Sequence, residues 1–250
     1  MKLRTLKLTL AYDGTDYSGW QVQRNAPRTI QAVLQRTITA IAGERAVVIG
    51  SGRTDAGVHA LGQVAHVRLR SRIACDRLRL ALNHRLPKDI VVRKIEEVPA
   101  TFQAQYHATR KRYAYRIVNG PVVLPFERRY VQQIWPPLNV ALMRREASVL
   151  RGRHDFRAFQ AAGRRIDDTR RTMSDIRVRR QGTAITIEVE ADGFLYHMVR
   201  NIVGTLIDIG RGHRPPDTMR KLLRVKDRRL AGPTAPARGL CLVSVTYGNR

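Results

Sequence analysis

Cysteine and long apolar runs are scarce in this chain of 250 residues, and each shortage excludes a class of protein. Its two cysteines, Cys75 and Cys241, lie far apart and fit neither a disulfide framework nor a metal-ligand spacing. No apolar run approaches the roughly 20 residues that span a bilayer, and Met1–Lys7 alternates charged with apolar residues, unlike a signal peptide. We therefore expect a cytoplasmic protein in a reducing compartment, with no membrane span.

Acidic residues are also few, and this shortage leaves the chain strongly cationic. Against 20 Asp and Glu stand 46 Lys and Arg, of which only seven are Lys, so the net charge is +26. Such a surplus repels itself unless a polyanion binds, which indicates nucleic acid or an acidic surface as the partner. Arg also suits bidentate phosphate contacts and stacking on bases better than Lys does. An Arg-rich genome that fills solvated faces with Arg is the alternative explanation.

Metal ligands in a usable arrangement are missing from the sequence as well. The seven histidines include no His-x-His or His-x-x-x-His pair, and the carboxylates are scattered. Zinc and transition-metal sites need several such side chains close together. We therefore expect no metal site. The 43% hydrophobic residues, in contrast, suffice for a sizeable core, so a folded globular protein is expected.

The apolar pattern of the first hundred residues predicts the order strand, helix, strand, strand, helix, strand. The elements are a strand at 6–12, a helix at 30–41 bounded by Thr29 and Gly43, strands at 46–49 and 63–69, a helix at 75–86 and a strand at 90–95. This order resembles a ferredoxin-like split βαβ unit, in which helices cover one face of an α+β sheet.

The second half of the chain repeats this mixture of strands and helices. Strands are predicted at 113–118, 130–135, 173–180, 184–190 and 240–247, and helices at 138–150, 194–209 and 216–225. We therefore predict an α+β fold of two similar ferredoxin-like or RRM-like halves, residues 1–105 and 106–250. A continuous antiparallel sheet flanked by helices is expected to join them, with the active cleft between the halves.

One glycine-rich segment between two predicted strands, residues 50–60, carries a carboxylate at Asp55. Glycine permits positive φ and lets a ligand approach the backbone closely. An Asp in such a turn is held by neighbouring amides, which fix its carboxylate and keep it ionised. Arg53 is close enough to pair with Asp55 or to hold a phosphate. A plain Asx-turn in a surface loop is the alternative, and for the Asp-Ala-Gly string alone it is the more common case.

The wider string Ser51–Ala60 resembles the catalytic motif of the TruA family of tRNA pseudouridine synthases. Further strings resemble the same family in the same order along the chain. They are Tyr12-Asp13-Gly14 with Gly19-Trp20-Gln21, the basic and aromatic segment Ala108–Tyr115, the apolar segment Phe194–Gly204, and Gly239-Leu240. Each string is moderately specific alone, and together they are highly specific.

The resemblance implies roles for particular residues of this chain. Asp55 is implied as the nucleophile, with Arg53 stabilising a flipped-out nucleotide and Arg200 as the ionic partner of Asp55. Tyr113 is implied to stack on the target base and to take part in proton transfer, and Leu240 to line the uracil pocket. No cofactor is implied. A carboxylate nucleophile is an established form of covalent catalysis, and whether it attacks C6 of the base or C1′ of the ribose stays open.

The residues around Tyr113 agree with a site for an extruded base. Chemistry on a base within a stem requires the nucleotide to be flipped out and received by an aromatic surface. Arg110, Lys111 and Arg112 directly precede Tyr113, so candidate phosphate contacts and a stacking ring share one short stretch. The alternative is a strand whose tyrosines, Tyr113 and Tyr115, point into the core.

Arg200 lies within the most apolar predicted helix of the chain. At helical spacing, His197, Arg200 and Gly204 share one face of that helix. A buried Arg without a partner is costly, so this position favours a nearby carboxylate, for which Asp55 is the candidate. A solvent-facing Arg200 is the alternative.

A second basic region lies between residues 151 and 180, which contain ten Arg. Residues 160–172 have few apolar side chains and are predicted to form a mobile loop that clamps an RNA backbone. The candidate RNA-binding residues in it are Arg164, Arg165, Arg170 and Arg171. A solvated loop without an RNA contact fits the composition equally well.

The sequence therefore predicts an isomerase that converts uridine to pseudouridine at positions 38, 39 and 40 in the anticodon stem-loop of tRNA. The resemblance further implies a homodimer that binds tRNA across both subunits. Two alternatives belong to other classes. One is a non-catalytic RNA-binding protein of the same fold, and the other is a metal-dependent nuclease, which the scattered carboxylates disfavour.

Overall fold

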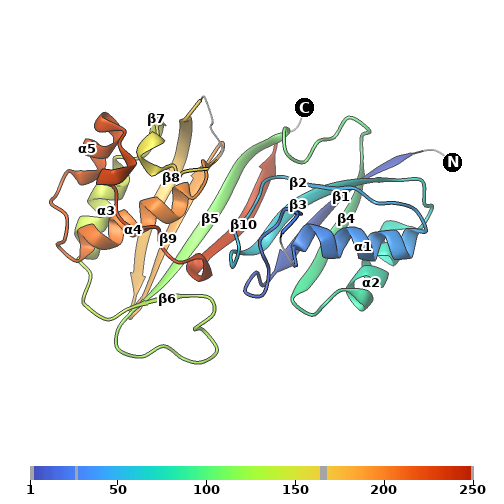
Figure 1. The fold of residues 1–250 in the computed structure, drawn as a ribbon, viewed down its shortest axis with the longest axis horizontal. Helices are drawn as coiled ribbons and strands as arrows, with labels where there is room; N and C mark the ends of the chain where they lie inside the picture. Colours follow the sequence, from blue (N-terminus) through green and yellow to red (C-terminus); the bar gives the residue numbers. More distant parts are fainter. Residues whose placement is uncertain (1–2, 26–27, 164–167, 249–250) are drawn as a thin grey trace. The chain divides into compact units, whose positions relative to one another are not determined.

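The computed structural model describes residues 3–25, 28–163 and 168–248. Contacts between residues divide the chain into two compact units (Figure 1). The first unit comprises Met1–Thr109 together with Leu242–Arg250, and the second comprises Arg110–Cys241. The sequence predicts a boundary at residue 105, with the whole remainder of the chain in the second half. The contacts of the chain from Leu242 onward group it with the first unit instead. The chain crosses between the units within strands β5 (Ala108–Asn119) and β10 (Leu240–Tyr247).

The sheet of the first unit has β1 between two antiparallel neighbours. Its strands are β1 (Arg4–Tyr12), β2 (Val48–Gly50), β3 (His59–Leu69) and β4 (Ile90–Val98). β1 pairs with β3 on one side and β4 on the other, so that Leu8 lies opposite both Ala65 and Ile95. The short strand β2 pairs antiparallel with β3. The predicted order of strands and helices in this part of the chain is confirmed.

Helix α1 (Ile30–Ala42) of the first unit begins and ends where the sequence predicts. The Thr29 side chain accepts a hydrogen bond from the Ala32 amide, and Gly43 ends the helix in the left-handed region at φ 68°. These are the usual polar N-cap and glycine C-cap. Ile30, Leu34 and other apolar residues of α1 are buried, and α1 packs against α2 (Cys75–Arg85).

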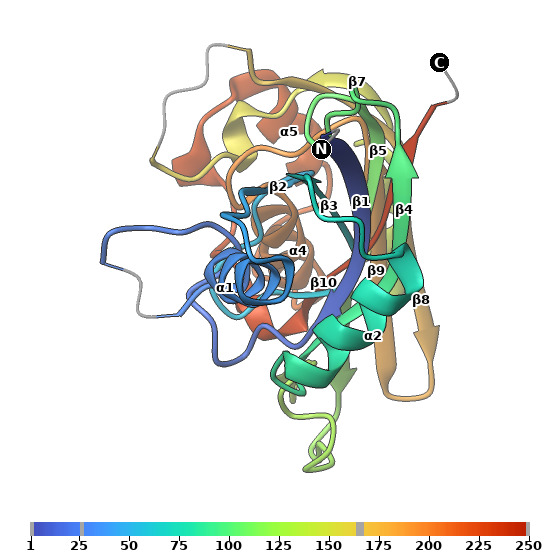
Figure 2. The ribbon, with the colours of Figure 1, turned by 90° about the vertical axis from the view of Figure 1, so that its right-hand side faces the viewer.

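The second unit has a sheet in the order β5-β9-β8-β7. Its further strands are β6 (Gln132–Ile134), β7 (Gly152–Asp155), β8 (Arg170–Gln181) and β9 (Ala184–Ala191), and its helices are α3 (Val140–Ser148), α4 (Met198–Gly210) and α5 (Thr218–Val225). The pairings are antiparallel except that β6 is parallel to β5. Helices α4 and α5 lie on one side of this sheet (Figure 2). The α+β class is therefore confirmed.

Part of the segment predicted as a mobile basic loop is a strand instead. Arg170 and Arg171 begin β8, where they lie opposite Asp155 and His154 of β7. The sequence concealed this pairing because β7 is only four residues long and has no apolar alternation, whereas ladder hydrogen bonds join main-chain groups whatever the side chains are. Arg164 and Arg165 lie outside the described residues.

Helix α4 begins four residues later than the apolar pattern predicts. His197 precedes its first residue and has φ 57°, in the left-handed region, so the right-handed helix cannot extend back through it. The prediction that His197, Arg200 and Gly204 share a helix face is therefore wrong for His197. Its ring instead lies 3.8 Å from that of Tyr196, centroid to centroid.

Buried polar groups of α4 hold the segment that leads into β10. The Asn201 side chain donates to the carbonyl of Phe159 at 2.8 Å and accepts from the Thr234 hydroxyl at 2.6 Å. Thr205 accepts from the amide of Gly232 at 2.9 Å. Because unpaired buried polar groups are costly, these bonds fix residues 231–235 on the helix. Short 3₁₀ turns lie on either side of that segment, at Arg228–Leu230 and Ala237–Gly239, and another lies at Arg157–Phe159.

None of the helices in the described part of the chain has the length and apolar character needed to cross a bilayer.

Gly204 gives a test of this packing, because a Cβ there would overlap the carbonyl oxygen of Pro233. Helix propensity alone predicts that Gly204→Ala stabilises α4 by about 1 kcal/mol. We expect the overlap to dominate and to lower the free energy of unfolding by about 2–3 kcal/mol, measured by urea denaturation. Gly120→Ala is the matched control, because its Cβ would meet only Thr183 at 3.4 Å. Equal stability of both variants would contradict the close packing at Gly204.

Candidate active site

Asp55 lies in the turn between β2 and β3 of the first unit. Its side chain is partly exposed, Arg53 is exposed, and Thr54 between them is buried. The turn is closed by a hydrogen bond from the Val58 amide to the Asp55 carbonyl, at 3.1 Å. A partly exposed carboxylate on a closed turn can reach a substrate while its backbone stays fixed.

Buried side chains from β1 and β3 form hydrogen bonds with residues of this turn. The hydroxyls of Tyr12 and Thr54 are 2.8 Å apart. The side-chain amide of Gln63 donates to the Gly52 carbonyl at 3.1 Å, and its oxygen accepts from the Ser51 hydroxyl at 2.8 Å. Gln63 and Ser51 are fully buried, so breaking these bonds would leave polar groups unpaired in the interior. The motif string alone does not predict this support, because Tyr12 and Gln63 lie before and after it.

The segment 14–20 packs directly against the Asp55 turn. The Trp20 amide donates to the Thr54 carbonyl at 3.0 Å, and the Gly57 amide donates to the Tyr17 carbonyl at 3.3 Å. Gly19 has φ 87°, and a Cβ there would lie 2.6 Å from the Thr54 oxygen. A Cβ at Gly14 would overlap the Val58 carbonyl. Only glycine permits this approach of two backbones.

His59, which follows the motif, is buried beneath the same segment. Its Nδ1 accepts a hydrogen bond from the Gly14 amide at 3.1 Å. Within residues 3–25, 28–163 and 168–248, no three His, Cys, Asp or Glu side chains gather in a way that could hold a metal ion. His59 therefore makes a structural contact that joins the start of β3 to Gly14.

Tyr113 lies on β5 of the second unit and is buried, with 8% of its surface exposed. Its ring meets that of Phe194 edge to face, with the centroids 5.2 Å apart. Tyr115 is also buried, and its hydroxyl lies 2.8 Å from both the Gln132 side-chain oxygen and the Pro236 carbonyl. Both tyrosines are therefore buried, as the core alternative predicts. The role of Tyr113 as a wall of a base pocket stays a prediction.

Burial raises the pKa of the Tyr115 phenol well above its ordinary value, although the charges of Arg200 and Arg238 oppose the rise. The phenol therefore stays protonated at working pH and can donate to either of its two neighbours. Tyr115 also fills the space next to Gly239, where a Cβ would come within 2.5 Å of the ring. The sequence predicted only that Tyr115 could point into the core. In the structure its hydroxyl also links β5 to the segment before Leu240.

Arg200 lies on α4, partly buried, where it faces the same segment. Its Nε donates to the Ala235 carbonyl at 2.7 Å, and its own carbonyl accepts from the Ala235 amide at 3.1 Å. Leu240 follows the 3₁₀ turn and is buried. Within the second unit, residues 235–240 therefore bring Tyr115, Arg200 and Leu240 into one region.

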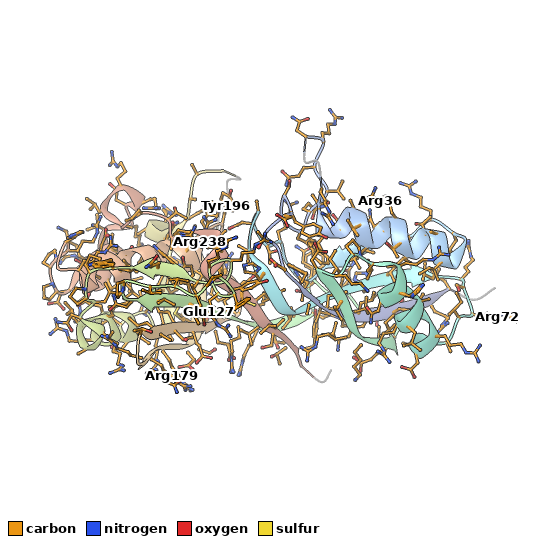
Figure 3. The ribbon with its side chains drawn as sticks, turned by 90° about the horizontal axis from the view of Figure 1, so that it is seen from below. Arg36, Arg72, Glu127, Arg179, Tyr196 and Arg238 are labelled. Carbon is orange, nitrogen blue, oxygen red and sulfur yellow. The ribbon has the colours of Figure 1, made fainter. Side chains whose placement is uncertain are left out.

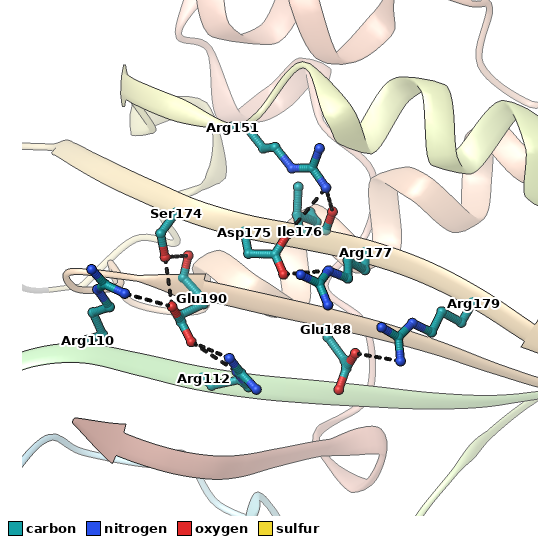
Figure 4. A network of polar contacts seen from close by, with 10 residues as sticks. All are labelled: Arg110, Arg112, Arg151, Ser174, Asp175, Ile176, Arg177, Arg179, Glu188 and Glu190. Carbon is teal, nitrogen blue, oxygen red and sulfur yellow. Dashed lines mark hydrogen bonds and ion pairs between the residues drawn. The ribbon is translucent and has the colours of Figure 1, made fainter.

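The basic residues before Tyr113 are divided between two faces of β5, because successive side chains of a strand alternate. Arg110 and Arg112 both pair with Glu190 of β9, at 3.7 Å and 2.7 Å (Figure 4). Lys111 lies on the face of Tyr113. Desolvation by burial, followed by the charge of Arg171, lowers the pKa of Lys111 below its ordinary value.

A row of further ion pairs covers β8 and β9. Asp175 pairs with Arg151 at 3.3 Å and with Arg177 at 2.7 Å, and Glu188 pairs with Arg179 at 3.8 Å (Figure 4). The carboxylates lie deeper than the guanidinium groups: the Glu190 side chain is 14% exposed and that of Arg110 is 62% exposed. This face therefore presents arginine donors outward even where the charges are paired.

Exposed arginines occur on both units. Arg36 and Arg72 project from the first unit and Arg179 projects from the second (Figure 3). Arg171 donates to the carbonyls of Asp168 and Arg170, at 3.0 Å and 2.6 Å, which orders it beside the start of β8. Phosphate contacts to ordered arginines such as Arg171 supply the non-specific part of nucleic-acid affinity.

A family model described as tRNA pseudouridine synthase matches residues 9–107 and 147–248, which are most of the chain. The chain belongs to the tRNA pseudouridine synthase family. Pseudouridine synthases are isomerases, so the expected class of enzyme is confirmed at the level of the family. The matched segments contain Asp55, Arg53, Arg200 and Leu240, whereas Tyr113 lies between them. The individual roles of these residues stay predictions.

Similarity to bacterial proteins named tRNA pseudouridine synthase A extends over almost the whole chain. The protein of Thermoanaerobacter sp. (strain X514) is 46% identical over 245 residues, covering 98% of this chain and 100% of the relative. That of Moorella thermoacetica is 47% identical over 243 residues, covering 97% and 99%. That of Limosilactobacillus reuteri is 44% identical over 247 residues, covering 97% and 96%.

The Glu190 cluster predicts a pH-dependent stability. Burial opposes ionisation of this carboxyl, but hydrogen bonds from Arg112 and Ser174 outweigh it and hold the pKa below its ordinary value. A lowered pKa stabilises the folded state above the unfolded value of about 4.3, and this contribution is lost as the pH falls further. We expect Glu190→Gln to lower stability by about 0.5–1 kcal/mol at pH 7, since the arginines are exposed, and by less at pH 3.

Urea unfolding of wild type and Glu190→Gln across this pH range measures the difference. Arg112→Gln provides the control background, because Glu190→Gln should cost less where its main partner is already gone. A difference that stays constant from pH 7 to pH 3 would contradict the assignment to the ionised carboxylate.

Proposed function

We propose that this chain isomerises uridine to pseudouridine at positions 38, 39 and 40 in the anticodon stem-loop of tRNA. The full-length similarity to proteins named tRNA pseudouridine synthase A carries the proposal. It is supported by Asp55 in its closed turn and by the charge of +26, which suits an RNA substrate. The specific tRNA positions come from the family resemblance of the Asp55 segment.

In this proposal Asp55 is the nucleophile. The reaction breaks the N1–C1′ bond, forms a C5–C1′ bond, releases the proton of C5 and places a proton on N1, so no oxidant or reductant is needed. A carboxylate that attacks C6 of the base keeps the uracil bound to the enzyme while it rotates, and one that attacks C1′ of the ribose keeps the sugar bound instead. The side chains that support the turn serve this role, because Tyr12 bonds to the Thr54 side chain and Gln63 bonds to the Gly52 carbonyl.

The other residues bind and orient the nucleotide in the proposal. The exposed Arg53 stabilises the extruded nucleotide, and Tyr113 and Leu240 supply aromatic and apolar walls for uracil. The partial burial of Arg200 and its bond to Ala235 are consistent with a fixed guanidinium. The pairing of Arg200 with Asp55 and the cleft between the halves stay predictions.

We further propose that arginine-rich surfaces bind the phosphate backbone of the tRNA. The outward guanidinium groups of Arg110 and Arg112 and the ordered Arg171 support this role. A homodimer that binds tRNA across both subunits, in the cytoplasm, completes the proposal.

Asp55→Ala tests the nucleophile. With tRNA that carries tritium at uridine C5, we expect wild type to release tritium and Asp55→Ala to be slower by at least about 10³-fold, because the covalent step is lost. Filter binding should show that the variant still binds tRNA. Asp76→Asn is the matched control, since it removes an Asp of the same unit that is 91% exposed.

Two results of the tritium assay would contradict the proposal. No release by wild type on several tRNAs, with binding retained, would favour a non-catalytic RNA-binding protein. Release by Asp55→Ala at the wild-type rate would contradict the assignment of the nucleophile.

Arg110→Gln and Arg171→Gln test the binding surface. We expect each to weaken tRNA binding and to reduce the slope of log affinity against log salt by about one. The rate at saturating tRNA should not change. Arg36→Gln removes the same charge from an exposed residue outside this surface, and we expect it to leave the slope near the wild-type value. Loss of activity at saturating tRNA would contradict a pure binding role.

A further inference from the structure

The Tyr17 side chain of the first unit contacts two residues that come later in the chain, Arg28 and Asp89. The Tyr17 hydroxyl donates to Oδ1 of Asp89 at 2.6 Å and accepts from Nη2 of Arg28 at 2.9 Å. The Arg28 guanidinium lies 4.5 Å from the centroid of the Tyr17 ring and 3.7 Å from Oδ2 of Asp89. Tyr17 is only 3% exposed. We call Tyr17, Arg28 and Asp89 the clasp.

The Tyr17 phenol is kept as a hydrogen-bond donor. Burial, followed by the hydrogen bond to Asp89 and its negative charge, raises the pKa of Tyr17 well above its ordinary value, and Arg28 opposes this only in part. The bond from the phenol to a carboxylate is charge-assisted and therefore stronger than one between neutral groups. The Tyr17 phenol therefore stays protonated at neutral pH and keeps its proton for the bond to Asp89.

The clasp anchors a segment that has no helix or strand to hold it. Residues 13–20 connect β1 to the region before α1 without regular structure. Main-chain bonds accompany the clasp at two of its residues: the Asp13 amide donates to the Asp89 carbonyl at 2.9 Å, and the Ser18 amide donates to the Arg28 carbonyl at 2.8 Å. The three clasp residues therefore tie this segment to the start of β4 and to the start of α1.

The same segment is hydrogen-bonded to the Asp55 turn. The Tyr17 carbonyl accepts from the amide of Gly57, two residues after Asp55, and the Trp20 amide donates to the carbonyl of Thr54, the residue before Asp55. Both sides of the nucleophile are thus bonded to a segment whose position depends on the clasp. A displacement of Tyr17 is transmitted to Asp55 through one main-chain hydrogen bond.

We propose that the clasp of Tyr17, Arg28 and Asp89 sets the position of Asp55 for the chemical step. This inference rests on the proposed function, because it assigns Asp55 the reacting carboxylate. The clasp residues are positioning residues, since they act through the Asp55 turn rather than on the substrate. Small misplacements of a reacting group lower the rate far more than they lower stability.

Tyr17→Phe is the sharpest test, because it removes the hydroxyl and keeps the ring and its contact with Arg28. We expect kcat for tritium release to fall about tenfold and KM for tRNA to stay within about twofold of wild type. Thr39→Val is the matched control. It removes a hydroxyl of the same unit that accepts from the Ala46 amide at 3.1 Å, in the last turn of α1, whereas Arg28 of the clasp precedes the first turn of that helix. We expect it to leave kcat unchanged.

Hydrogen exchange in the tRNA-free protein gives a readout that does not depend on activity. We expect the Gly57 amide to exchange at least about tenfold faster in Tyr17→Phe than in wild type, and to be unchanged in Thr39→Val. If wild type releases no tritium from any tRNA, the proposed function fails, while this exchange still tests the clasp itself.

Asp89→Asn and Arg28→Lys keep the inference testable if Tyr17→Phe does not fold. Each retains one interaction of the clasp, so we expect a smaller fall in kcat than for Asp89→Ala or Arg28→Ala. Tyr17→Phe combined with Asp89→Ala should lower kcat less than the product of the two single effects, because the residues act as one unit. Folded variants with wild-type kcat and wild-type exchange at Gly57, or with a change in KM alone, would overturn the proposal.

Discussion

The need to satisfy buried polar groups around an irregular turn is the constraint on which the candidate site depends. Asp55 lies outside helix and strand, so its neighbours cannot rely on a regular ladder of hydrogen bonds. Tyr12, Gln63 and the segment that contains Tyr17 supply the missing partners. The position of the carboxylate is therefore set by side chains and carbonyls from β1, β3 and the segment after β1, and a change in any of them reaches the turn directly.

A second arrangement concerns the surplus of positive charge. The carboxylates of Glu190 and Asp175 each accept two arginines and lie deeper than those partners. Such pairs in exposed positions contribute little to stability, but they order the guanidinium groups. An ordered Arg loses less entropy in a further hydrogen bond, so the acidic residues fix the basic surface and do not simply cancel its charge.

The sequence predicted the elements whose apolar residues recur at a regular period. β1 lies where the alternation of apolar and polar residues predicts a strand, and α1 lies between the predicted caps Thr29 and Gly43. The short β7 escaped prediction because its side chains show no such period, and with it the strand character of Arg170 and Arg171. The start of α4 was placed too early because Phe194 and Leu195 are as apolar as the helix, and only the left-handed backbone of His197 marks its true start.

The sequence by itself determined the family, the identity of the candidate nucleophile and the chemical character of the partner. These depend on local strings and on total charge, which need no knowledge of distance. The tertiary structure alone decided which residues support Asp55 and how the basic residues are paired. Tyr17, Arg28 and Asp89 meet only after β1, α1 and β4 have folded together. Arg110 and Arg112 reach Glu190 only because β5 pairs with β9 in a register that places residue 112 opposite residue 190. Contacts between residues so distant in sequence follow from packing, which no local pattern encodes.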